Sequence, residues 1–179
     1  MIAIGMLTSC SGDSKATKAT VGEAKKVTAP AATNTLKVNT ANSKVNWTGS
    51  KPAGKHSGTI ALSSGSVQLD GGDLSGGKFI LDMTSITVTD LEAGQGKEKL
   101  EGHLQSDDFF GVANYPTASL KFTKVQKMSG GYEVEGDLTI KGKTESVSFE
   151  LATTKGTATT SITIDRTKYD IRYGSGSFF

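Results

Sequence analysis

The feature that most constrains the fold is an alternation of apolar and polar residues that recurs from Leu36 to Ile164. Successive side chains of a β-strand point to opposite faces, so a period of two predicts strands with one apolar face. Clusters of glycine, serine and aspartate separate the runs, and those at residues 63–65, 70–73 and 129–131 are short enough for hairpins. The sequence therefore predicts an all-β fold, an antiparallel up-and-down meander.

A meander of this kind has to bury its apolar face and protect two edge strands. Closure into a barrel does both, and a barrel of about eight strands encloses either packed side chains or one ligand. Periodicity by itself favours the packed interior. The expected inward set carries no charge, and its members proposed to line a ligand are Trp47, Leu62, Phe79, Leu81, Met83, Leu120, Phe122, Leu138, Ile140, Phe149 and Ile162.

The alternation is interrupted near residues 95–112, where a short helical segment is expected. Leu100 and Leu104 lie one helical turn apart, and Ser106 is a candidate cap for a second turn. Pro116 then excludes further helix and pushes Tyr115 toward an extended conformation. Apolar residues alternate again from 118 to 122, so a strand is expected to begin there.

The first 35 residues predict an anchored tether rather than part of the fold. Leu7-Thr-Ser-Cys10 follows an apolar start and matches a lipobox, so residues 1–9 are interpreted as a partial lipoprotein signal peptide and Cys10 as the lipidated anchor. Residues 10–35 are rich in Ser, Thr, Ala and Lys and are expected to form a flexible tether. Lipidation at Cys10 would hold the chain at a membrane without a transmembrane helix.

Four stretches identify a family resemblance. His103-Leu-Gln-Ser-Asp-Asp-Phe-Phe110, followed by Tyr115-Pro-Thr-Ala118, resembles the signature of the YceI-like family, and residues 76–86, 136–142 and 165–179 fit the same family in the same order. The resemblance implies a lipocalin-like β-barrel at residues 36–179 that binds a polyisoprenoid in the bacterial cell envelope, facing the periplasm or the surface. It favours a ligand, an isoprenoid, quinone or similar amphiphile, over a solid interior. Family members continue past the last matched stretch, so the domain is expected to lack its last strand.

Candidate catalytic groups are few. His56 and His103 are the only histidines, and no spacing of carboxylates supports a metal site with them. Asp107 and Asp108 follow Ser106 and are interpreted as favourable charges at a helix N-terminus. Ser175 lacks the context of a nucleophile. We therefore expect a non-enzymatic protein without a cofactor. The alternative is a solid-barrel structural or stress-response interaction protein without ligand.

The charged residues bear on partners in two ways. The 20 basic and 18 acidic residues are interspersed, which does not indicate a nucleic-acid partner, and nothing in the sequence indicates the oligomeric state. Arg166 and Arg172, the only arginines, would share one face of a strand, and arginine binds phosphate well. They are candidates for contact with a lipid headgroup. The competing interpretation pairs them with Asp165, Asp170 or the acids of the helical segment.

Overall fold

A computed structural model describes residues 34–51 and 54–173 of the 179-residue chain. Cys10, Ser175 and most of the predicted tether lie outside the described residues. The elements are, in order, β1 (Asn34–Lys37), η1 (Thr40–Asn42), β2 (Val45–Lys51), β3 (Gly54–Asp70), β4 (Asp73–Val88), α1 (Lys97–Gln105), β5 (Thr117–Met128), β6 (Gly131–Ile140), β7 (Lys143–Thr154), β8 (Thr157–Thr160) and η2 (Arg166–Tyr169).

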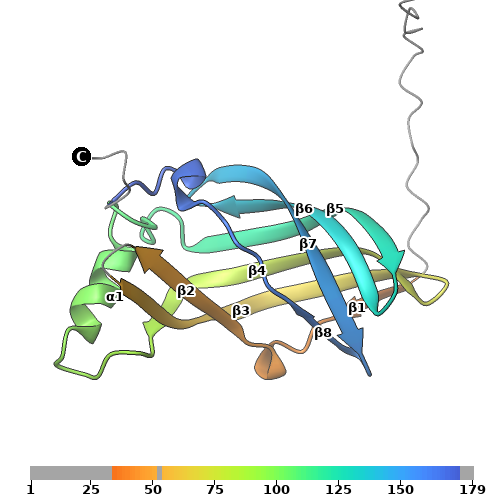
Figure 1. Cartoon of the computed structure of the whole chain (residues 1–179), viewed down its shortest axis with the longest axis horizontal. Helices are drawn as coiled ribbons and strands as arrows, with labels where there is room; N and C mark the ends of the chain where they lie inside the picture. Colours follow the sequence, from red (N-terminus) through yellow and green to blue (C-terminus); the bar gives the residue numbers. More distant parts are fainter. Residues whose placement is uncertain (1–33, 52–53, 174–179) are drawn as a thin grey trace, which may run out of the picture. The chain divides into compact units, whose positions relative to one another are not determined.

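The strands form one antiparallel sheet that curls into a half-barrel with α1 at one end (Figure 1). The order is β1-β3-β4-β5-β6-β7-β8, and β2 pairs with another part of β3. The predicted lipocalin-like meander is confirmed. Among the described residues, the ladders do not join β8 to β1 or β2, so the curl has an open side.

The hairpin turns are confirmed at two of the three predicted places. Gly71 and Gly72 have φ of 56° and 92° between the paired Asp70 and Asp73, the left-handed geometry that a tight hairpin requires. The turn after Met128 is equally short, because Met128 pairs with Gly131. The predicted turn at residues 63–65 is wrong. β3 continues through these residues without a turn. A β-bulge between Leu62 and Ser64 shifts the register, so that Leu62 lies opposite Leu81 and Gly65 lies opposite Phe79.

The strand predicted around Ile162 and Ile164 is also wrong. β8 ends at Thr160, and the chain then leaves the sheet as an irregular segment. The Asp165 carboxylate ends that segment, because its Oδ1 accepts hydrogen bonds from the Thr167 N–H at 2.9 Å and the Thr167 hydroxyl at 2.8 Å. Asp165 thus caps η2, which accounts for a short helix where alternation predicts a strand.

The helical segment is confirmed, with one difference at its end. α1 buries Leu104 among the side chains at its end of the sheet, and Glu101 Oε1 accepts a 2.8 Å hydrogen bond from the N–H of Val88 at the end of β4. The predicted turn after Ser106 is present, because the Ser106 carbonyl accepts a hydrogen bond from the Phe109 N–H at 3.0 Å, but the Ser106 hydroxyl donates to the His103 carbonyl at 2.7 Å. The side chain therefore closes α1 and does not cap a following helix.

Candidate functional site

The concave face of the sheet carries ten of the eleven predicted interior residues, and Ile162 lies in the irregular segment after β8. Burial divides the eleven into two groups. Four are buried and seven are half-buried. The buried ones are Met83, Phe122, Ile140 and Phe149, and the half-buried ones are Trp47, Leu62, Phe79, Leu81, Leu120, Leu138 and Ile162. A packed interior would bury all of them, so the middle of the curl is incompletely filled by the protein's own side chains.

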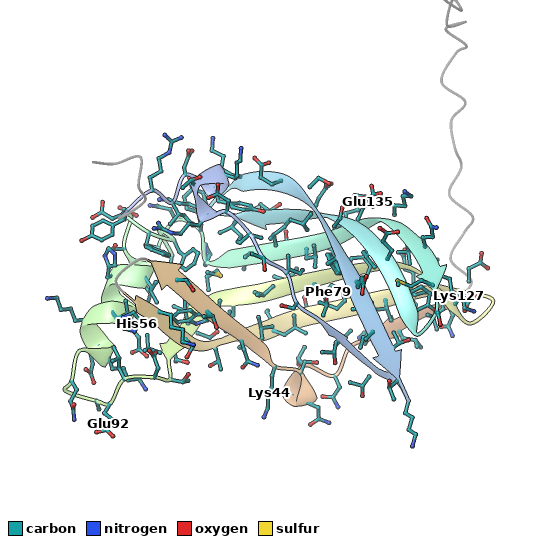
Figure 2. All side chains as sticks on the ribbon, in the orientation of Figure 1. Lys44, His56, Phe79, Glu92, Lys127 and Glu135 are labelled. Atoms are coloured by element: carbon teal, nitrogen blue, oxygen red, sulfur yellow. The ribbon has the colours of Figure 1, made fainter. Side chains whose placement is uncertain are left out.

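Five of the half-buried residues form a continuous strip across four strands, which we call the apolar belt. Cross-strand pairing places them side by side, because Leu62 lies opposite Leu81, Phe79 opposite Leu120, and Leu120 opposite Leu138. In Figure 2 Phe79 lies between the helix end, near His56 and Glu92, and the opposite end, near Lys127. The apolar belt is the part of the concave face that a hydrocarbon chain would cover.

Two buried clusters flank the apolar belt. The cluster at the helix end contains Ile60, Met83, Ile86, Val88, Leu104, Val112, Ala118, Ile140, Tyr169 and Ile171. The other contains Phe122, Val134, Phe149 and Leu151. Phe122 lies between Phe79 and Phe149, with ring centroids 5.4 and 5.8 Å away, in aromatic contacts typical of a core. Four residues of the apolar belt are packed on one side against these clusters, Leu81 and Leu138 against the first and Phe79 and Leu120 against the second, and they stay half-buried.

Gly77, which has no side chain, leaves room for the rings of Phe79 and Phe122. A Cβ at Gly77 on β4 would lie 2.8 Å from the Phe122 ring. Any larger residue would displace the ring that anchors the second cluster. Gly77 lies within one of the stretches that identify the family resemblance.

Buried polar atoms without partners gather at the helix end. Among the described residues they are Trp47 Nε1, His103 Nε2 and the Tyr169 hydroxyl. Tyr169 belongs to the helix-end cluster and Trp47 packs against it. His103 makes an edge-to-face contact with Phe109, 5.7 Å between ring centroids, and Phe109 also packs against that cluster. Buried polar groups in native proteins are nearly always hydrogen-bonded, so each of these three atoms keeps an unused hydrogen-bonding capacity.

A groove of about 330 Å³ lies beside β7, between its edge and the segment that leads to η2. Its lining is Glu145, Ser146, Val147, Ser148, Thr163, Ile164, Asp165, Lys168 and Tyr169. Glu145 is in phase with the inward residues Val147, Phe149 and Leu151 and lies opposite Leu138 of the apolar belt. Glu145 is not among the residues predicted from the sequence. The alternation of β7 nevertheless indicates it, because a residue two positions before Val147 lies on the same face of a strand.

Tyr169 is the most deeply buried residue of this groove, with 1 % of its surface exposed. Burial, and secondarily the Glu145 carboxylate, raises the pKa of the Tyr169 hydroxyl above its ordinary value. The hydroxyl is therefore protonated at neutral pH and able to donate a hydrogen bond.

The structure does not place the two arginines on a shared strand. Arg166 begins η2, donates from Nη1 to the Ile171 carbonyl at 2.9 Å, and lies 5.4 Å from the centre of the Phe109 ring. Arg172 pairs with Asp170 at 3.5 Å, one of the ion pairs given by the competing interpretation. The strand geometry behind the headgroup hypothesis is wrong, while headgroup contact itself stays a prediction.

The remaining candidate groups have structural partners or lie in turns. His56 Nδ1 lies 2.9 Å from Asp90 Oδ2, whose other oxygen accepts from the Ser57 N–H at 3.0 Å. The prediction that Asp107 and Asp108 lie at a helix N-terminus is wrong, because they lie in the turn that follows the C-terminus of α1. The Asp107 carbonyl accepts a hydrogen bond from Lys141 Nζ there at 2.7 Å. Within residues 34–51 and 54–173, we find neither a cluster of three or more metal-binding side chains nor a helix able to cross a membrane.

Comparison with known proteins gives concordant matches. Residues 36–178 match the model of the YceI-like domain. Protein YceI of Escherichia coli is 32 % identical over 69 residues, 38 % of this chain, and a UPF0312 protein of Yersinia pestis is 30 % identical over the same length. The match spans 36 % of the length of each of these relatives. The crystal structure of Burkholderia cenocepacia BcnA superposes with a TM-score of 0.64 at 22 % identity, covering 78 % of this chain and 87 % of that one.

Proposed function

The chain belongs to the YceI-like domain family, and from this premise we propose that its concave face binds the hydrocarbon chain of an isoprenoid lipid, a quinone or a similar amphiphile without covalent chemistry. The observation that carries the proposal is the half-burial of the apolar belt between two fully buried clusters. A half-buried apolar strip on a concave face is stabilised by whatever apolar group covers it. Each 100 Å² covered contributes about 2.5 kcal/mol.

The belt suits a linear, flexible chain better than a compact ring system. It crosses β3, β4, β5 and β6, and its residues are leucines and one phenylalanine, with no charged side chain among them. The absence of charge within the belt means that an apolar chain can lie on it without desolvating an ion. Specificity for a particular lipid has to come from polar groups at its ends.

A matched pair of substitutions tests the proposal. Leu81→Gln puts an amide into the belt, whereas Ile80→Gln puts the same amide on the opposite face of β4, beside Ser64 and Ser119. Binding of a long isoprenoid, measured by titration and by native mass spectrometry of detergent-free protein, should weaken at least tenfold in Leu81→Gln and remain unchanged in Ile80→Gln. Equal binding by both variants and the parent would refute the belt as the binding surface.

The same experiment addresses the alternative of a solid structural or interaction protein. That alternative expects empty protein after mild extraction and no uptake of added isoprenoid by the parent. It also expects Leu81→Gln to lower thermal stability more than Ile80→Gln, with no other consequence. Copurified isoprenoid in the parent would exclude it.

We further propose that the domain is held at the bacterial cell envelope as a lipoprotein through Cys10, facing the periplasm or the surface. The support is the lipobox Leu7-Thr-Ser-Cys10 and the Ser-, Thr-, Ala- and Lys-rich stretch after it. Cys10→Ala should abolish metabolic labelling with a fatty-acid analogue and release the protein from the membrane fraction. Labelling that persisted in the variant would refute the assignment.

A further inference from the structure

We propose that the groove beside β7 is a headgroup subsite for an uncharged amphiphile whose head both donates and accepts a hydrogen bond, such as an isoprenoid alcohol, with Tyr169 and Glu145 as its partners. The inference rests on the proposed function, because it assigns the polar end of the ligand whose hydrocarbon chain covers the apolar belt. It selects among ligand classes that the belt alone would accept equally.

The groove adjoins the belt through one cross-strand pair. Glu145 of β7 lies directly opposite Leu138 of β6, and alternation puts both side chains on the concave side. Side chains opposite each other in an antiparallel pair have Cβ atoms about 5 Å apart. A chain lying on the belt therefore reaches the groove by passing from Leu138 over the neighbouring Glu145 of β7.

Tyr169 supplies the donor. Its hydroxyl is buried and has no hydrogen-bond partner, although the residue lines a groove of about 330 Å³, which lies within the range of small-molecule pockets. Leaving a buried hydroxyl unpaired is costly, and a ligand oxygen at the groove would remove that cost. The other two orphan atoms, Trp47 Nε1 and His103 Nε2, are not among the residues that line this groove.

The charges of the groove select against an anionic head. Glu145 and Asp165 contribute two carboxylates to the lining, against the single ammonium of Lys168. The Arg166 guanidinium already donates to the Ile171 carbonyl. A diphosphate would therefore face net negative charge, whereas an alcohol hydroxyl can donate a hydrogen bond to the Glu145 carboxylate and accept one from the Tyr169 hydroxyl.

Three ligands that share one chain test the subsite: geranylgeraniol, geranylgeranyl diphosphate and the matched hydrocarbon without the hydroxyl. Isothermal titration calorimetry of detergent-free protein measures the affinity for each. The parent should prefer the alcohol to the hydrocarbon. Tyr169→Phe should weaken alcohol binding roughly fivefold, the effect of one net hydrogen bond, and leave hydrocarbon binding unchanged.

Glu145→Gln provides a second variant, because it removes the carboxylate and keeps the size of the side chain. It should raise the affinity for the diphosphate severalfold. The matched control is Glu150→Gln, the same change on the same strand but on the opposite face, opposite Glu133. It should leave all three affinities unchanged.

Tyr132→Phe controls for a structural effect of losing a tyrosine hydroxyl. Its hydroxyl accepts a hydrogen bond from the Leu74 N–H at 3.1 Å, so its loss should lower the melting temperature without changing the preference for the alcohol. Tyr169→Phe should keep or raise the melting temperature, since it removes an unpartnered buried group.

The outcomes separate the subsite from the proposed function. Hydrocarbon binding by the parent, with an alcohol preference that Tyr169→Phe does not reduce, would overturn the subsite and leave the belt standing. A parent that binds the diphosphate more tightly than the alcohol would also overturn the subsite. A parent that binds none of the three would overturn the proposed function, and the subsite with it.

Discussion

Replacing Leu138 by phenylalanine tests whether the middle of the curl has room that the protein's own side chains do not use. Leu138 and Val134 lie on the same face of β6, but Leu138 is half-buried in the apolar belt, whereas Val134 is 0 % exposed in the second cluster. The same enlargement at the two positions therefore enters an open space in one case and a packed one in the other.

The magnitudes differ enough to measure. Inserting methylenes into a packed core costs about 1–3 kcal/mol, so Val134→Phe should lower the melting temperature by roughly 2–4 °C for each kcal/mol. Leu138→Phe should change the free energy of unfolding by about 0.5 kcal/mol or less, because the added ring covers surface that is already exposed. It should nevertheless weaken isoprenoid binding at least tenfold, since it occupies part of the belt.

Urea denaturation of both variants in the absence of lipid, followed by isoprenoid titration of Leu138→Phe, gives the two quantities. Equal destabilisation by the two substitutions would show that the belt is packed as tightly as the second cluster. Unchanged isoprenoid binding by a stable Leu138→Phe protein would show that the ligand does not lie on the belt. Either result would refute the reasoning.

Two further predictions concern the scaffold. Gly58→Ala should destabilise the protein by about 1–3 kcal/mol, because its Cβ would meet a backbone carbonyl of β4 and lie 2.7 Å from the Trp47 ring. Gly49→Ala is the control, because its Cβ would lie 3.9 Å from that ring, and it should change the free energy of unfolding little in urea denaturation. Equal destabilisation by the two variants would refute this account. A hydrogen bond from Lys127 holds the pKa of the Asp73 carboxyl below its ordinary value. The stability that the ionised Asp73 contributes is therefore fully present above the pKa of Asp73 in the unfolded chain, and it is lost as the pH falls through the lower pKa of Asp73 in the folded protein. Asp73→Asn should therefore lower the melting temperature at neutral pH and converge with the parent in strong acid, and a constant difference across that range would contradict the assignment.

Much of the fold could be predicted from the sequence because alternation is a local property of a strand. The row Phe79, Leu81 and Met83 was expected on one face and lies on one face, and the glycine turns at residues 70–73 and 129–131 are where their φ requirement predicts them. The errors arose where a local pattern had two solutions. Residues 63–65 suit a turn or a bulge, and Ser106 can begin a helix or close one.

The candidate site was predictable only in part. The sequence indicated which residues face inward, and the family resemblance indicated a ligand, but neither distinguished the half-buried Leu138 from the fully buried Val134 four residues away. Exposure depends on how far the sheet curls and on what lies across the curl, which are not local properties.

The sequence by itself determined the all-β meander, the helical interruption and the apolar character of the concave face, because each follows from the spacing of neighbouring residues. Only the tertiary structure decided which of those apolar residues remain half-buried and brought Glu145 and Tyr169 to the lining of one groove. That pairing joins a strand to a short helix beyond the next strand, and only the curling of the sheet sets the distance between them.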